Sequence, residues 1–199
     1  MRLLWVSPRG DGTVIAEKVR DAGHQVVMYG EGVGLPLIKQ ADLWTFAKLS
    51  DLVVVDGPFP VVRTRRSWRP HQDALFFDEL RRAYHIKALG TTPTIDLLIG
   101  DSRYLRKWCE RLTIPFTKDE IVGESWTSGG WFRANDIIPN GPYLAAWKPL
   151  FKSVGFRGWF EMSGVMSQDG PIVTGASGGW PSETIPEGQE ADFLNRMAQ

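Results

Sequence analysis

The first 57 residues alternate between short apolar runs and stretches with helical spacing, and this alternation constrains the fold more than any other feature. Apolar runs predict buried strands over residues 2–6, 24–30 and 51–57. Apolar residues at helical spacing predict helices over 13–23 and 35–50. Strand, helix, strand, helix, strand is the pattern of a parallel sheet with crossover helices, so we expect an α/β fold.

The rest of the chain predicts further helices and then antiparallel strands. Helical patterns lie over 71–85, 101–114, 143–155 and 187–199, with a short strand at 86–90. Residues 123–143 are rich in Gly, Trp and turn formers, so no regular element is assigned to them. The "SQDG" stretch, Ser167 to Gly170, predicts a tight turn between two antiparallel strands.

The composition narrows the class of protein. Lys plus Arg and Asp plus Glu each number 23, so the net charge is zero, which argues against a dedicated nucleic-acid binder. Cys109 is the single cysteine, which excludes an internal disulfide and a cysteine zinc site, and we expect it to be a packing residue. With no signal peptide and no apolar stretch of about 18 residues, the chain is expected to be soluble and cytoplasmic, without membrane contact.

The turn after the first strand is the first candidate site. In "SPRGDGTVIA" Gly10, Asp11 and Gly12 precede a helix, where backbone N–H groups can face a phosphate. Ile15 stands where a third glycine would complete a dinucleotide-binding pattern. A plain strand-to-helix turn is the alternative.

The loop after the third strand is the second candidate. Asp56, Gly57 and Pro58 lie in "VDGPFPVV", at the carboxyl edge of the predicted sheet, where ligands bind in open α/β folds. A proline-rich loop without a ligand is the alternative. The basic loop that follows could meet an anion or remain solvated; it contains Trp68 and four arginines, Arg63, Arg65, Arg66 and Arg69.

Several motifs in a common order resemble ATP-grasp ligases of the phosphoribosylamine–glycine ligase type. The stretch "ALGTTPTIDLLIGDSRYLRKWCERLTIPFT" resembles the family's turn, helix start and Ile-Pro helix end; its matches are Gly90-Thr91-Thr92, Gly100 to Arg103, Lys107 and Ile114-Pro115. The "VVVDGPFPVV" stretch resembles a Val-Gly-Pro segment of the family, and 156–184 resembles its late strands. The resemblance implies a pre-ATP-grasp-like domain over 1–118 and a reduced ATP-grasp-like lobe over 119–199.

The chain departs from this family where ATP and metal would bind. Ten residues stand between Thr117 and Ser128, where the family inserts an ATP-gripping subdomain. The family's metal-binding Glu and Asn fall on Gly175 and Ser177, and a following Arg falls near Gly179. Because Mg²⁺ needs hard oxygen ligands, we expect neither ATP nor Mg²⁺ as a cofactor unless the protein is an active ligase.

Three functions follow from the resemblance. The first is a degenerate ligase-like protein, a pseudoenzyme, that binds a phosphorylated sugar or nucleotide. Its ligand-binding residues would be Gly10, Asp11, Gly12, Asp56, Gly57, Pro58, Ser102, Arg103 and Lys107. The second is a structural or interaction module with a protein partner or a second copy of the chain, motivated by nine Trp residues. The third is an active phosphoribosylamine–glycine ligase of purine biosynthesis, alone or completed by another chain.

Overall fold

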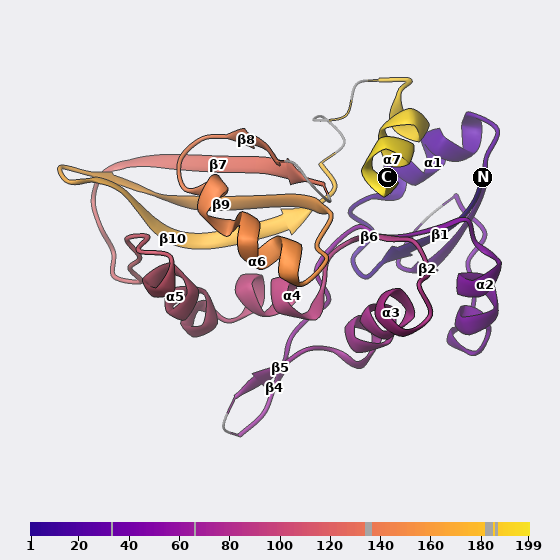
Figure 1. The fold of residues 1–199 in the computed structure, drawn as a ribbon, viewed down its shortest axis with the longest axis horizontal. Helices are drawn as coiled ribbons and strands as arrows, with labels where there is room; N and C mark the ends of the chain where they lie inside the picture. Colours follow the sequence, from indigo (N-terminus) through magenta and orange to yellow (C-terminus); the bar gives the residue numbers. More distant parts are fainter. Residues whose placement is uncertain (33, 66, 134–136, 182–184, 186) are drawn as a thin grey trace.

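Two four-stranded sheets stand side by side in the computed structural model, which describes residues 1–32, 34–65, 67–133, 137–181, 185 and 187–199 (Figure 1). The first sheet is parallel, in the order β2-β1-β3-β6. Its strands are β1 (Arg2–Ser7), β2 (Gln25–Gly30), β3 (Leu52–Val55) and β6 (Ala88–Gly90). The parallel sheet with crossover helices that the sequence predicts is confirmed.

Helices cover both faces of the parallel sheet. They are α1 (Thr13–Asp21) and α7 (Glu190–Ala198) on one face, and α2 (Leu43–Leu49) and α3 (Gln72–Ala83) on the other. Successive strand side chains point to opposite faces. Leu3 and Trp5 therefore pack with α1 and α7, while Leu4 and Val6 pack with α2 and α3.

The helix predicted over 35–50 is wrong in its first part. Helical structure begins at the 3₁₀ turn η1 (Gln40–Asp42) and continues into α2. Residues 35–39 instead run beside the edge strand β2: Met28 N donates to the Pro36 carbonyl at 2.8 Å, and Ile38 N donates to the Met28 carbonyl at 2.8 Å. The edge strand offers unpaired backbone groups, and pairing with them outweighs the helical spacing of the side chains.

The second sheet is antiparallel, in the order β10-β9-β7-β8. Its strands are β7 (Glu124–Phe132), β8 (Ile137–Asn140), β9 (Gly158–Ser167) and β10 (Gly170–Gly179). The predicted turn at "SQDG" is confirmed as the β9–β10 connection. The expectation of no regular element over 123–143 is wrong, because β7 lies there and pairs with both β8 and β9.

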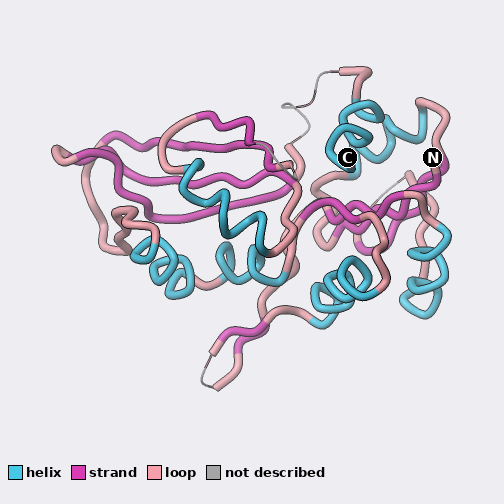
Figure 2. The backbone as a smooth tube through the Cα atoms, in the orientation of Figure 1, coloured by secondary structure: helices cyan, strands magenta, loops and turns pink. Residues whose placement is uncertain are grey.

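Three helices cover one face of the antiparallel sheet, and the face opposite them is more open. The helices are α4 (Pro93–Gly100), α5 (Ser102–Arg111) and α6 (Lys148–Ser153), the last preceded by the 3₁₀ turn η2 (Leu144–Trp147). Their core includes Leu98 and Leu105 from the helices and Phe160 and Met162 from β9. A short hairpin, β4 (Val62–Arg63) and β5 (Trp68–Arg69), extends away from both sheets (Figure 2).

The two sheets meet where β6 approaches the start of β9. Gly90 N donates to the Arg157 carbonyl, which forms an antiparallel bridge. Gly90 has φ +99°, and a Cβ there would lie 1.7 Å from the Val55 carbonyl oxygen, so this junction requires glycine. The division into 1–118 and 119–199 stays a prediction; α4 and α5 pack on the antiparallel sheet, whereas α7 packs on the parallel one.

Aromatic rings fill the space between the sheets near this junction. The Trp131 ring centroid lies 5.5 Å from that of Trp159, 5.0 Å from Trp180 and 4.8 Å from Phe193. The Trp5 ring of β1 lies 6.1 Å from Trp180. This cluster joins β1, β7, β9 and α7 into one apolar contact between the two sheets.

None of the helices within the described residues is both long and apolar enough to cross a membrane.

Candidate functional site at the carboxyl edge

Asp56 is the central polar residue at the carboxyl edge of the parallel sheet. It follows β3 directly and is buried. Its Oδ2 accepts hydrogen bonds from Trp5 Nε1 at 2.6 Å and from Gly12 N at 3.0 Å. Burial raises the pKa of the carboxyl to about 6, although these two bonds and the neighbouring Ser7 hydroxyl favour the charged form. Asp56 Oδ1 and Ser7 Oγ are buried without a hydrogen bond of good geometry.

The glycine turn after β1 is shaped around this carboxylate. A Cβ on Gly12 would lie 2.4 Å from Asp56 Oδ2, so glycine lets the helix start approach the acid closely. The N–H of Gly12, which the sequence suggests for a phosphate, donates to Asp56 instead. Beside this turn Arg9 Nη2 pairs with Asp11 Oδ2 at 3.0 Å, within reach of Gly57. The predicted residues Gly10, Asp11, Gly12, Asp56, Gly57 and Pro58 thus lie in adjoining loops.

A second buried carboxylate, Asp96 of α4, fixes the loop after β3. Asp96 Oδ1 accepts from Thr91 Oγ1 at 2.6 Å and from Phe59 N at 3.2 Å, while Oδ2 is buried without a partner. Burial raises its pKa to about 7. The sequence analysis missed Asp96 and the helix that contains it. Thr92, whose hydroxyl accepts from Ile95 N at 3.4 Å, and the following Pro93 are the signals that predict a helix start there.

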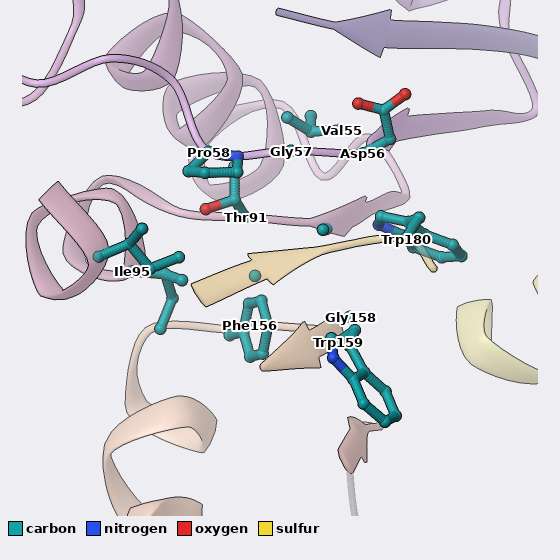
Figure 3. Close-up of a pocket in the computed structure, with 14 residues that line it drawn as sticks. Val55, Asp56, Gly57, Pro58, Thr91, Ile95, Phe156, Gly158, Trp159 and Trp180 are labelled. Atoms are coloured by element: carbon teal, nitrogen blue, oxygen red, sulfur yellow. The ribbon is translucent and has the colours of Figure 1, made fainter. Parts of the chain in front are cut away.

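The loop from Asp56 to Pro60 separates two hollows. The first lies between the sheets and encloses about 10 Å³, which is room for about one water molecule. Figure 3 shows the side chains of Ile95, Phe156, Trp159 and Trp180 along it, with the Asp56 carboxyl group turned away. This hollow is too small for an organic ligand.

The second hollow has a volume of about 180 Å³ and opens at the ends of β1 and β2. Its lining residues are Val6, Pro8, Tyr29, Gly30, Phe59, Pro60, His71 and Asp73. Tyr29 Oη donates to Asp73 Oδ2 at 3.0 Å, and burial together with Asp73 raises the tyrosine pKa to about 12. The ring of His71 stacks on Phe59 with 5.9 Å between centroids, and its Nδ1 accepts from Asp73 N at 3.2 Å.

The basic hairpin begins and ends at the rim of this second hollow. Pro60 and His71 both line the hollow, and the chain between them forms β4 and β5. Arg63, Arg65 and Arg69 are exposed on this hairpin, and the Arg63 guanidinium lies 5.9 Å from the centroid of the Trp68 ring. Arg66 lies outside the described residues. The connectivity therefore places at least three cationic side chains on a segment whose two ends line a sugar-sized hollow.

The three remaining predicted residues lie on a different element. Ser102, Arg103 and Lys107 belong to α5, which packs on the antiparallel sheet and is separated from the parallel sheet by α4 (Figure 1). Arg103 is exposed, and its Nε lies 3.4 Å from Asp101 Oδ1. Among the described residues, no hydrogen bond or ion pair links these three side chains to the Gly10–Pro58 loops. Their role as ligand contacts stays a prediction.

The open face of the antiparallel sheet contains the positions at which the resemblance implies metal ligands. Gly175 pairs with Ser163 and Ser177 with Glu161 across β9 and β10. Ser177 Oγ donates to Glu161 Oε1 at 3.1 Å. Glu124 is the other acidic residue of β7, β9 and β10, and the strand alternation places it on the opposite face. Among the described residues of these three strands, this face has one carboxylate, so they do not fit the ligand set that the resemblance implies for Mg²⁺.

Two further expectations concern nucleophiles and metals. Cys109 is buried among core residues, and burial raises the pKa of its thiol to about 12, so it suits packing rather than nucleophilic attack. Within the described ranges, no three His, Cys, Asp or Glu side chains gather as a metal site would need. His71, one of three scattered histidines, instead caps the start of α3.

Comparisons with known proteins bear on the fold. No protein-family model matches the chain, and no curated protein sequence matches it. Among solved structures, N5-carboxyaminoimidazole ribonucleotide synthetase from Thermotoga maritima is similar with a TM-score of 0.59 and 12% identity, over 88% of this chain and 68% of that one. D-alanine–D-alanine ligase from Aeromonas hydrophila is similar with a TM-score of 0.56 and 9% identity, over 98% of each chain.

A third similar structure is the biotin carboxylase domain of a single-chain bacterial carboxylase, with a TM-score of 0.55 and 12% identity, over 100% of this chain and 66% of that one. These three are named as a synthetase, a ligase and a carboxylase domain, and at 9–12% identity the similarity shows that the chain shares their α/β fold. The similarities do not single out the phosphoribosylamine–glycine ligase type.

Proposed function

We propose that this protein uses an ATP-grasp-like fold to bind a phosphorylated sugar or nucleotide and does not carry out metal-dependent ligation. The observation that carries the proposal is the second hollow with the basic hairpin at its rim. The residues on the open face of the antiparallel sheet support the absence of ligation. Gly175 has no side chain to offer a cation, and Glu161 already accepts a hydrogen bond from Ser177.

The size of the second hollow favours a sugar over a larger group. Its 180 Å³ is below the roughly 300–1,000 Å³ of pockets that enclose drug-sized ligands, so a pentose or a single ring fits best. Asp73 and Tyr29 offer hydrogen-bonding groups for sugar hydroxyls, and Phe59 supplies an apolar wall. A phosphate on the sugar would extend toward the hairpin arginines, which suit phosphate because guanidinium groups bind it through paired hydrogen bonds.

Calorimetry with ribose 5-phosphate, AMP and unphosphorylated ribose tests this proposal. We expect saturable heat with ribose 5-phosphate, and binding weaker by about tenfold or more for ribose, since charge-assisted hydrogen bonds are the stronger ones. The double substitution Arg65→Gln and Arg69→Gln should remove this preference for the phosphorylated sugar. Arg196→Gln, at an exposed position of α7, is the matched control and should leave the affinity unchanged.

Two outcomes would contradict the proposal in different ways. If no phosphorylated compound gives heat at millimolar concentration, the carboxyl edge is not a sugar-phosphate site. ADP release with ATP, Mg²⁺, phosphoribosylamine and glycine that disappears in Arg103→Ala and Lys107→Ala would instead establish the active ligase. A role as an interaction module, with a protein partner or a second copy, stays a prediction that light scattering on the pure protein can test.

A further inference from the structure

A pair of joined hollows lies at the amino edge of the parallel sheet, the edge opposite to the proposed sugar site. Leu52 begins β3 and Ala88 begins β6, and parallel strands all begin at the same edge of a sheet. The first hollow has a volume of about 400 Å³ and the second about 350 Å³. They share Leu52, Lys87 and Ala198, and together we call them the amino-edge cleft.

Three cationic side chains line the larger hollow, and none of the described residues that line it is acidic. The lining consists of Leu52, Arg81, Ile86, Lys87, Ala88, Leu89, Gly155, Arg157 and Ala198. Arg157 is close enough to Arg81 for the two charges to repel, which adds to the lowering of the Arg81 pKa by burial. A group of like charges around one hollow is unfavourable unless an anion offsets it.

Backbone carbonyls hold the Arg157 guanidinium in place, and one carbonyl together with Asp78 holds that of Arg81. Arg157 Nη1 donates to the carbonyls of Met197 at 3.3 Å and Ala198 at 2.9 Å. Arg81 Nη1 donates to the Gly155 carbonyl at 3.0 Å. Carbonyl groups orient a guanidinium without cancelling its charge, so the positive charge of Arg157 remains available to a ligand.

Of the nearby carboxylates, Asp78 offsets part of the Arg81 charge, and Asp51 is engaged with a cation that does not line the cleft. Asp78 accepts from Arg81 at 2.6 Å and also pairs with Arg82 at 2.9 Å, so its one charge is shared between two arginines. Asp51, which lines the smaller hollow, pairs with Arg2 at 3.1 Å. Lys87 is exposed and its side chain makes no hydrogen bond or ion pair with any described residue, and Arg81 Nε is buried without a partner. The Lys87 ammonium group and Arg81 Nε are therefore hydrogen-bond donors in the cleft that remain available to a ligand.

The floor of the cleft is apolar. Leu52 and Leu89 are buried strand residues beneath it, and Ile86 and Ala88 are partly exposed at its wall. A simple inorganic anion would use the cations and leave this floor in contact with water. An anion that also has an apolar body would cover it, and burying apolar surface adds to the affinity.

We propose that the amino-edge cleft is a second binding site, for a small organic anion with an apolar body, held by Arg81, Lys87 and Arg157. The proposal does not depend on the sugar site, because the two sites lie at opposite edges of the parallel sheet. A ligand here would also contact the end of α7 through Arg157 and Ala198, and so would link that helix to β6.

Titration of the ¹⁵N-labelled protein with inorganic phosphate and with phenyl phosphate, at constant ionic strength, tests this site. We expect saturable shifts in the amides of Leu89 and Gly155, whether or not those of Gly30 and Asp73 at the sugar site also shift. Phenyl phosphate should bind more tightly than inorganic phosphate by about tenfold, because its ring buries apolar surface on the floor.

Two substitutions of exposed lysines separate a local contact from general charge. Lys87→Gln should weaken phenyl phosphate by about fivefold or more, since it removes one charge-assisted contact. Lys118→Gln removes the same charge from the exposed loop between α5 and β7 and should leave phenyl phosphate binding unchanged. The proposal is overturned if both variants bind equally, if the two phosphates bind equally, or if the shifts are absent or confined to the sugar site. Because neither lysine side chain has a hydrogen-bond or ion-pair partner in the part of the chain that the structure describes, both variants should fold like the parent.

Discussion

The carboxylates at the carboxyl edge of the parallel sheet differ from the one on the open face of the antiparallel sheet. Asp56 and Asp96 are buried. Asp56 accepts hydrogen bonds from Trp5 and Gly12, which are far away in the chain, and Asp96 accepts from the distant Phe59 N and from Thr91 five positions earlier. Glu161 lies at the surface and accepts a bond from Ser177. Asp56 and Asp96 therefore fix the positions of loops, whereas Glu161 contacts a side chain on the neighbouring strand.

This difference shows where acidic residues matter in the molecule. On the open face, where we propose that the metal chemistry has been lost, Gly175 and Ser177 stand in place of metal ligands. A substitution there should change the free energy of unfolding little. At the carboxyl edge the carboxylates determine the course of the backbone, so a change there should be costly. The predictions below test that contrast, from the largest expected effect to the smallest.

The stability of the protein should fall as the pH rises from 5 to 8. Burial raises the pKa values of Asp56 to about 6 and of Asp96 to about 7, so the folded chain keeps protons that the unfolded chain releases near pH 4. Stability from these groups is present at low pH and is lost as the pH passes 6 and 7. We expect a loss on the order of 4 kcal/mol between pH 5 and 8, measured by urea unfolding.

The control for this prediction is the double variant Asp56→Asn and Asp96→Asn, in which the slope should flatten. Asp51 and Glu190, whose pKa values are lowered, are ionised in both the folded and the unfolded chain over this range and add nothing to the slope. A stability that rises with pH over the same range would show that these two carboxyls are not buried as described.

Removing the Asp56 side chain should destabilise the protein by about 3 kcal/mol, because it leaves the buried N–H groups of Trp5 and Gly12 without an acceptor and opens a cavity. Asp56→Asn keeps one oxygen that can accept both bonds and should cost much less at pH 8. Glu161→Ala, on the open face, should change the free energy of unfolding by no more than about 0.5 kcal/mol. If Asp56→Ala and Glu161→Ala lowered the free energy of unfolding equally, the contrast between the carboxyl edge and the open face would be wrong.

The sequence predicts the strands of the parallel sheet well, and the reason is local. Runs such as Leu52 to Val55 are apolar throughout, as strands covered on both faces must be, and the turn residues that bound them are adjacent in sequence. The β9–β10 hairpin is predicted for the same reason, since Asp169 and Gly170 mark its turn. Each of these elements is specified by residues within a few positions of one another.

The missed elements depend on partners far away in the chain. The glycines of β7 suggest a turn, but a Cβ on Gly129 would lie 2.2 Å from the Trp159 ring, so Gly129 makes room for a side chain 30 positions later. Gly12 suggests a phosphate turn in the same way, whereas its N–H meets Asp56, 44 positions later. A single sequence contains the glycine in each case but not the reason for it.

Gly12 at the carboxyl edge and Gly175 on the open face offer a matched pair of substitutions. Gly12→Ala should cost about 2 kcal/mol, because the new Cβ would lie 2.4 Å from the Asp56 carboxylate and force it away. Gly175→Ala should stay within about 0.5 kcal/mol, since the nearest atom, Ser163 Oγ, lies 3.2 Å from the added Cβ and can rotate. Thermal unfolding of both variants measures the difference. A larger cost at Gly175 would mean that the open face is packed more tightly than its residues indicate.

A charged substitution on the open face should change stability little and cation binding more. Gly175→Glu would place a carboxylate on the same face as Glu161, one residue pair along β10 from Ser177. Because the position has room and the side chain can extend into solvent, the free energy of unfolding should change by no more than about 1 kcal/mol. Two carboxylates on one face are a better site for Mg²⁺ than one, so calorimetry should detect Mg²⁺ binding in Gly175→Glu and less or none in Gly175→Gln, which matches its size without the charge. If the parent already binds Mg²⁺ as tightly as Gly175→Glu does, the open face holds a cation without the missing carboxylate, and the proposal that metal-dependent ligation has been lost fails with it.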